Sequence, residues 1–139
     1  SEDVKQIVER LKKKRRGEAD TDGNEVRPWG GFTTLENRPG YRVVRLEIEP
    51  GGKTSLQTHE HRSEHWIVVR GVARVRIGEV TRLVPVNESV LIPAGEIHRL
   101  ENPSKTETLV VIEVDVGSYV GEDDIRRYLD EYGRADRKG

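Results

Sequence analysis

Three of the four histidines in the sequence, His59, His61 and His65, lie within seven residues, and the fourth is His98. Imidazole is the commonest metal ligand among side chains. In a β-strand, residues two apart point to the same face, with their Cα atoms about 6.6 Å apart. His59 and His61 are therefore expected to bind one ion together, and the cluster predicts a site for a single divalent metal ion.

The next ligand along the chain is either Glu64 or His65. On a straight strand His65 would lie roughly 20 Å from His59, which is too far for one ion, so the chain must turn between His61 and Glu64. Beyond such a turn, strand alternation groups either residue with apolar neighbours. Periodicity therefore leaves both possibilities open.

His98 is expected to bring a ligand from another strand, because it follows the tight turn Pro93-Ala94-Gly95. Three histidines and one carboxylate suit zinc, iron, manganese, cobalt or nickel. Magnesium is a further candidate, and the spacing of the residues selects none of these metals.

Apolar alternation and turn signals predict an all-β domain that would position these ligands. Turn residues recur about every 8 to 12 positions, which is typical of a sandwich or barrel. An amphipathic helix is expected over residues 1–16, a polar linker over 17–25 and a second short helix over 121–132. The chain is therefore divided into a helix and linker, residues 1–25, and a β domain with a C-terminal helix, residues 26–139. The expected strands are residues 41–49, 53–61, 64–70, 73–77, 81–84, 89–92, 98–101 and 109–116.

The charge balance argues against nucleic acid as a partner. Charged residues make up 35% of the 139 residues, but the formal net charge is −1, so no overall positive field attracts a polyanion. No apolar run approaches the roughly 18 residues of a membrane span, and no signal-peptide pattern opens the sequence. Cysteine is absent, so thiolate ligands and disulfides are excluded. We expect a cytoplasmic protein with no nucleic-acid or membrane partner.

Two segments resemble the sequence motifs of the cupin superfamily. One runs from Gly52 through residues 59–64 to Gly71, and the other is residues 93–102. The resemblance implies a double-stranded β-helix, a jelly-roll-like barrel. It favours Glu64 over His65, because six residues separate the family's Glu from the motif's Gly, as here. One departure is that two residues, not three or four, separate the second His from Glu64. The implied metal ligands are His59, His61, Glu64 and His98.

A narrower resemblance, to the type II phosphomannose isomerases, covers most of the chain. It rests on residues 27–30, 56–66, 92–93 and 98–103 and on the tail, residues 121–125 and 132–134. In that family the cupin is usually the C-terminal part of a bifunctional mannose-6-phosphate isomerase and mannose-1-phosphate guanylyltransferase. The resemblance implies interconversion of mannose 6-phosphate and fructose 6-phosphate, a step of GDP-mannose biosynthesis. Unless this sequence is a fragment, guanylyl transfer is not expected, because the nucleotidyltransferase half has no counterpart in it. A homodimer is expected by analogy with other cupins.

The implied reaction needs an electrophile, an acid–base group and cations for the phosphate. A metal ion held partly by Glu64 would be the electrophile, acting as a Lewis acid. His65 is the expected acid–base group, because its imidazole titrates near neutral pH and it adjoins Glu64. Arg62 is the first candidate for the phosphate, since its planar guanidinium matches phosphate oxygens. Lys53 and Arg99 are weaker candidates, and an ideal strand would point Arg99 away from the metal.

Gln57 has the strand parity of His59 and His61, so it is expected to face the same cavity. It would serve there either as a metal ligand in place of one of them or as a sugar contact.

Two other functions compete with the isomerase. One is a metal-bearing sugar-binding or regulatory module without catalysis of its own, and the other is an iron-dependent cupin dioxygenase. The tail from residue 121 to residue 134 and the run Arg62–Trp66 argue against the dioxygenase, but they do not separate the first two functions. Turnover by the isolated chain would separate them.

Overall fold

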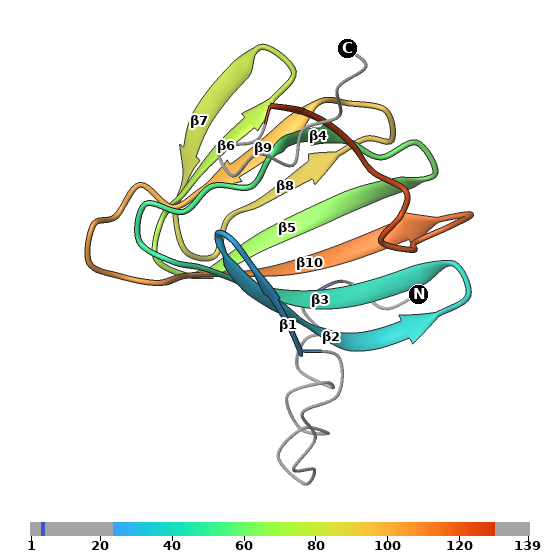
Figure 1. Cartoon of the computed structure of the whole chain (residues 1–139), viewed down its shortest axis with the longest axis horizontal. Coiled ribbons are helices and arrows are strands. Elements are labelled where there is room, and N and C mark those ends of the chain that lie inside the picture. The colour runs from blue at the N-terminus through green and yellow to red at the C-terminus, as the bar shows by residue number, and fades with distance from the viewer. Residues whose placement is uncertain (1–3, 5–23, 130–139) are drawn as a thin grey trace, which may run out of the picture.

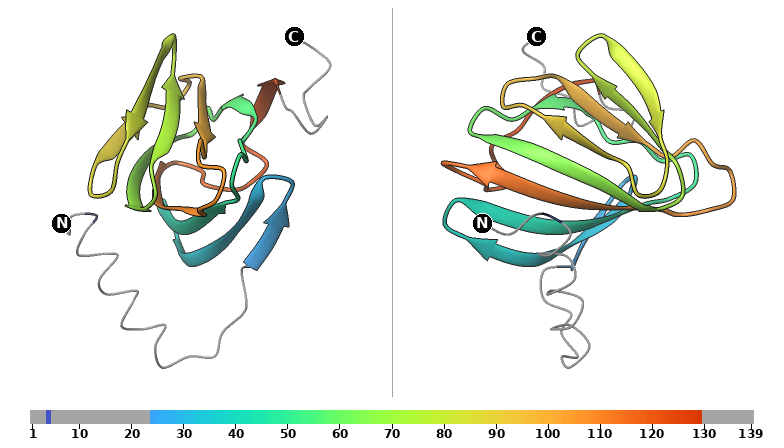
Figure 2. Two further views of the ribbon diagram at one scale, coloured as in Figure 1. Left: turned by 90° about the vertical axis from the view of Figure 1, so that its left-hand side faces the viewer. Right: turned by 180° about the vertical axis from the view of Figure 1, so that it is seen from behind.

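The computed structural model describes Val4 and residues 24–129. Eleven strands in this part of the chain form two antiparallel sheets that lie face to face (Figures 1 and 2). The six-stranded sheet has the order β1-β2-β3-β10-β5-β8, and the five-stranded sheet has the order β11-β4-β9-β6-β7. The all-β fold predicted from the sequence is confirmed.

The strand bounds agree with the expected ones at most positions, including the β6–β7 hairpin around Gly78. β1 and β2 have no counterpart among the expected strands, and β4 has three residues where nine were expected. The strands are β1 (Asn24–Arg27), β2 (Gly30–Arg38), β3 (Tyr41–Ile48), β4 (Leu56–Thr58), β5 (Arg62–Arg70), β6 (Ala73–Ile77), β7 (Val80–Val84), β8 (Ser89–Ile92), β9 (His98–Glu101), β10 (Leu109–Gly117) and β11 (Arg126–Leu129).

The core lies between the two sheets and grades into a polar region at one end. Alternation along β5 directs one set of residues inward, and this set changes from charged to apolar along the strand. The inward residues, all buried, are Arg62, Glu64, Trp66 and Val68. Their apolar members join a cluster that includes Ile48, Ile92, Leu100 and Leu109.

The central strand β10 is buried on both faces, which explains its nearly continuous apolar sequence. Its outward residues Ile112 and Val114 form a second cluster with Val43 of β3, and Val4 packs against this cluster. Val4 is the one described residue of the predicted N-terminal helix, and the rest of that helix and the linker up to residue 23 lie outside the described residues. β1 begins at Asn24, two residues before the predicted start of the β domain.

The C-terminal helix predicted from residue 121 is wrong over the described residues. Residues 122–124 form turns, and Arg126–Leu129 is a strand that pairs with β4. An apolar spacing compatible with a helix is a weak preference, and an open sheet edge with unpaired N–H and C=O groups outweighs it here. Residues 130–139 lie outside the described part. No helix that the structure describes is long and apolar enough to cross a membrane.

Candidate metal centre and cavity

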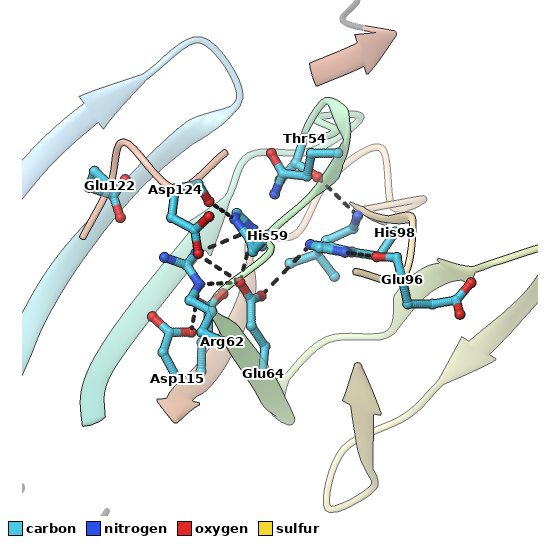
Figure 3. Close-up of polar contacts among 12 residues, drawn as sticks. Thr54, His59, Arg62, Glu64, Glu96, His98, Asp115, Glu122 and Asp124 are labelled. Carbon is cyan, nitrogen blue, oxygen red and sulfur yellow. Dashed lines mark hydrogen bonds and ion pairs between the residues drawn. The ribbon is translucent and has the colours of Figure 1, made fainter. Parts of the chain in front are cut away.

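The segment between β4 and β5 delivers the first predicted ligands. β4 ends at Thr58, and the chain bends at Glu60 and His61 before β5 begins at Arg62. The turn expected between His61 and Glu64 therefore occurs slightly earlier. It directs His59 and Glu64 toward the same point inside the barrel (Figure 3). Both side chains are buried, with 4% and 2% of their surface exposed.

Two backbone carbonyls fix the orientation of the two inward histidines. Nδ1 of His59 lies 2.5 Å from the carbonyl oxygen of Asp124, and Nδ1 of His98 lies 2.9 Å from that of Glu96. A carbonyl oxygen only accepts, so each Nδ1 must carry the proton. In the neutral ring the lone pair is then on Nε2, the atom that points into the site.

The turn between β8 and β9 contacts both His59 and His98. Gly95 donates its N–H to the carbonyl oxygen of His59 at 2.7 Å, and Glu96 in the same turn accepts from His98. Gly95 has φ of 82°, a left-handed conformation that glycine adopts without strain. The sequence Pro93-Ala94-Gly95-Glu96 thus serves two ligands on different strands.

Glu64 is an ionised carboxylate. Burial alone would raise its pKa, but the contacts with His59, then with His98 and with the guanidinium of Arg62, hold the pKa of Glu64 well below its usual value. Trp66 donates Nε1–H to Glu64 Oε1 at 2.9 Å and fixes the plane of the carboxylate. Burial lowers the pKa of His98, so this imidazole is neutral at physiological pH.

The ligand atoms of His59, Glu64 and His98 all lie within 4.8 Å of one another. His59 Nε2 is 2.9 Å from Glu64 Oε2, and His98 Nε2 is 3.9 Å from Glu64 Oε1. His98 Nε2 is buried and has no hydrogen-bond partner among the residues that the structure describes. An orphaned lone pair aimed at an anionic carboxylate is costly unless a cation lies between them. The three residues therefore fit a divalent metal ion of the kind that nitrogen and oxygen ligands bind.

His61 does not join this group. Its side chain is 58% exposed, and its Nδ1 lies 3.1 Å from Asp124 Oδ1. The prediction that His59 and His61 share a face required a strand through both residues, and β4 ends before either one. Gln57, which does belong to β4, lines the cavity beside His59 and pairs with His98 in the sheet register. Gln57 and His61 each lie two positions from His59, and the structure brings Gln57, not His61, to the site.

His65 lies on the face of β5 opposite to Glu64, where it is half-buried and pairs with Val114 and Leu91. Strand alternation turns it away from the cavity, so its expected acid–base role has no support in the geometry. Arg99 donates to the carbonyl oxygen of Thr54 on the outside of the other sheet. The backbone of Lys53 forms an isolated β-bridge with Glu101, and Lys53 is not among the described residues that line the cavity.

A cavity of about 600 Å³, counted out to its open mouth, adjoins the metal ligands. Several charged residues of its wall were not predicted as site residues. Arg42 shares the parity of Val44 and Leu46 on β3, so alternation could have identified it. Glu113 and Asp115 interrupt the apolar sequence of β10 at two-residue spacing, which is a signal of an inward polar face. No alternation or interrupted apolar pattern in the sequence marked Arg27, Arg127 or Glu122 as cavity residues. The charged residues that line the cavity are Arg27, Arg42, Arg62, Glu64, Glu113, Glu122 and Arg127.

Arg62 connects the metal ligands to the acidic residues of β10. Its guanidinium lies 2.8 Å from Glu64 Oε2, 3.3 Å from His59 Nε2 and 3.8 Å from Asp115 Oδ1. It also donates to the carbonyl oxygen of Gly121 at 3.3 Å. Although burial opposes its charge, attraction by Glu64 and then Asp115 raises the pKa of Arg62 further. Arg62, predicted as a phosphate ligand, is thus buried within the site.

Glu113 is a buried carboxyl next to another carboxyl. Its ligand oxygen lies within 4.8 Å of those of Glu64 and Asp115. Burial, then the charges of Asp115 and Glu64, raise the pKa of Glu113 well above its usual value. Arg42 lies 2.9 Å from Asp115 but 4.0 Å from Glu113. Burial and then Glu64 also raise the pKa of Asp115, but Glu113 is the one of the two carboxyls that lines the cavity.

Solved structures with the same fold are cupin domains. The chain matches the capsular polysaccharide assembling protein CapF from Staphylococcus aureus with a TM-score of 0.66 and 24% identity, over 77% of this chain and 32% of that one. It also matches the Cnp3 cupin domain of Schizosaccharomyces pombe with a TM-score of 0.59 and 16% identity, over 63% of this chain and 64% of that one. At these identities the likeness shows the fold alone, and the predicted cupin barrel is confirmed.

Sequence relatives narrow the family. The xanthan biosynthesis protein XanB of Xanthomonas campestris pv. campestris and a mannose-1-phosphate guanylyltransferase of Salmonella montevideo are each 46% identical over 133 residues, 96% of this chain. The chain spans 28% of the length of each. The family model described as mannose-6-phosphate isomerase C-terminal matches residues 14–130. The chain is therefore a cupin that belongs to the mannose-6-phosphate isomerase C-terminal family.

Proposed function

We propose that this chain is a metal-dependent isomerase that interconverts mannose 6-phosphate and fructose 6-phosphate. The observation that carries the proposal is the convergence of His59, Glu64 and His98 beside a cavity lined with arginines. Membership of the mannose-6-phosphate isomerase C-terminal family supports the choice of substrate. The finding that the chain spans 28% of its relatives leaves the guanylyltransferase named for one of them outside this proposal.

His59, Glu64 and His98 would hold one divalent ion, with Gln57 next to them as a further oxygen ligand or a sugar contact. When bound, the ion supplies Lewis acidity to the oxygen atoms on C1 and C2 of the sugar. Glu96 and Asp124 keep the two Nε2 atoms deprotonated through their carbonyl oxygens. Outer contacts of this kind orient metal-binding imidazoles and raise their affinity for the ion.

Proton transfer between C1 and C2 is assigned to Glu113 in place of His65. Glu113 faces the cavity, whereas His65 faces the other side of the sheet. A carboxyl whose pKa is raised well above its usual value can both accept and return a proton. Asp115, hydrogen-bonded to Glu113 and held by Arg42 at 2.9 Å, would position the Glu113 carboxyl, which in its ionised form takes the proton from C2 and then returns it to C1.

The test is turnover of mannose 6-phosphate by the purified chain, followed by NMR in D₂O after chelation and addition of Co, Zn, Mn, Fe, Ni or Mg in turn. Deuterium incorporation at C2 of recovered mannose 6-phosphate would report proton exchange separately from net conversion. We expect activity with at least one metal, loss of about 100-fold or more in Glu113→Gln, and near-wild-type activity in His65→Ala. Tight metal binding without turnover or exchange under any of these conditions would leave a binding module instead.

We also propose that the chain forms a homodimer and is located in the cytoplasm. The subunit count is measurable by light scattering coupled to gel filtration of the purified chain.

A further inference from the structure

Two arginines from different strands line the cavity and contact the same carboxylate. Arg42 lies on β3 with 6% of its side chain exposed, and Arg27 lies at the end of β1 with 25% exposed. The guanidinium of Arg27 lies 4.8 Å from the ring centroid of Phe32, which limits its orientation. Arg42 is anchored at its inner side by Asp115 at 2.9 Å.

Glu122 bridges these two arginines with its two carboxylate oxygens. Oε2 lies 2.5 Å from Nη1 of Arg42, and Oε1 lies 3.7 Å from Nη2 of Arg27, which also contacts Glu25 at 3.3 Å. The arginines belong to the sheet, whereas Glu122 lies in a turn and is 45% exposed. The anion is therefore the more easily displaced partner.

A carboxylate clasped by two guanidinium groups has the geometry that also suits phosphate oxygens. We propose that Arg27 and Arg42 form the subsite for the phosphate group of the sugar phosphate, and that Glu122 fills this subsite until the substrate displaces it. The inference rests on the proposed function for the identity of the substrate. A phosphate monoester carries more negative charge than one carboxylate at neutral pH, so exchange of Glu122 for phosphate is favoured.

The position of the subsite relative to the metal ligands suits a hexose phosphate. Arg42 and Arg62 both contact Asp115, and Arg62 in turn contacts Glu64 and His59. Two side chains, Asp115 and Arg62, thus link Arg42 to the metal ligands. The reacting carbons C1 and C2 lie at the opposite end of the sugar from the phosphate on C6, so the two sites must be distinct and adjacent.

The experiment is a titration of the chain with inorganic phosphate, followed by ³¹P NMR and calorimetry, in wild type and in Glu122→Gln and Arg27→Gln. Because Glu122 competes with phosphate, we expect Glu122→Gln to lower the dissociation constant about threefold to tenfold. Arg27→Gln should raise it about tenfold, the effect of losing one charge-assisted hydrogen bond. The matched controls are Asp123→Asn, next to Glu122 in the same turn, and Arg126→Gln, whose guanidinium stacks on Tyr128. Both controls should bind phosphate as wild type does.

Steady-state kinetics separate the subsite from the proposed reaction. With mannose 6-phosphate, Arg27→Gln should raise KM about tenfold and leave kcat within a factor of about three, as expected for a uniform binding contact. Phosphate binding that is unchanged or weaker in Glu122→Gln, with circular dichroism like wild type, would overturn the subsite even if turnover is found. Tighter phosphate binding in Glu122→Gln without turnover of any sugar phosphate would retain the subsite and reject the isomerase.

Discussion

The Nδ1 nitrogen of His59 lies 2.5 Å from the backbone carbonyl oxygen of Asp124, a residue 65 positions further along the chain. The carboxylate of Asp124 also accepts the backbone N–H groups of Glu60 at 3.1 Å and His61 at 2.9 Å. One residue of the C-terminal segment therefore holds the entire bend that presents His59 (Figure 3). This contact links the conformation of the tail to the geometry of the metal centre.

Asp124→Asn should destabilise the chain by about 1–2 kcal/mol at neutral pH, because one or two hydrogen bonds to an ionised acceptor are lost. Burial opposes ionisation of Asp124, but the hydrogen bonds from His61 and Glu60 lower its pKa below the usual value. Its stabilising effect is therefore present above the pKa of the unfolded state, about 3.8, and is lost as pH falls through the folded-state pKa. Urea unfolding from pH 7 to pH 3 measures the effect.

The difference between wild type and Asp124→Asn should shrink toward zero at the acidic end of that series. Asp123→Asn, one residue away, is the matched control and should match wild type at pH 7 within about 0.5 kcal/mol. A difference that is constant with pH would contradict the assignment of the effect to the ionised carboxylate.

Glu113→Gln should stabilise the metal-free chain at alkaline pH. Burial raises the pKa of Glu113 well above its usual value, so its contribution to stability is present below the unfolded-state pKa, about 4.5, and is lost as pH rises through the folded-state pKa. Glutamine keeps a donor for Asp115 and never ionises. The variant should therefore melt about 3 °C or more above wild type at pH 8 and close to it at pH 4.5, as measured by calorimetry.

The same substitution, Glu113→Gln, should lower activity although it raises stability. If Glu113 moves the substrate proton, the stabilised variant should be almost inactive. A Glu113→Gln chain with higher stability and full activity would assign the proton transfer to another group.

Gly95→Ala should weaken both stability and metal affinity. Gly95 adopts φ of 82°, and a methyl group there would meet no atom within 4 Å, so the cost is backbone strain alone, about 1–2 kcal/mol. The strained turn carries the N–H that binds the carbonyl oxygen of His59 and the carbonyl of Glu96 that binds His98. Gly40→Ala is the matched control, because Gly40 has φ of 89° and equally free surroundings but lies in the β2–β3 turn. Gly40→Ala should lower the melting temperature similarly and leave metal affinity unchanged. Equal metal affinities in wild type, Gly95→Ala and Gly40→Ala would show that the Gly95 turn does not position the metal ligands.

The strands of the barrel were predictable because alternation and turn residues are local signals, as in β5 and the β6–β7 hairpin. Glu64 and His98 could be selected as ligands from the motif resemblance, and the structure brings both to His59. The position of His61 was not predictable, since it depends on the residue at which β4 ends and on the pairing of the bend with Asp124. The strand Arg126–Leu129 was missed for a related reason, because it forms only against the edge of β4.

The central claim is that His59, Glu64 and His98 hold the metal ion and His61 does not. The most direct measurement is metal content by mass spectrometry after equilibrium dialysis of the chelated chain against one metal, for wild type, His98→Ala and His61→Ala. We predict about one ion per chain in wild type and His61→Ala and a loss of more than about tenfold in affinity in His98→Ala, the least that removal of a ligand should cost. Loss of the ion in His61→Ala, or full retention in His98→Ala, would contradict the assigned centre.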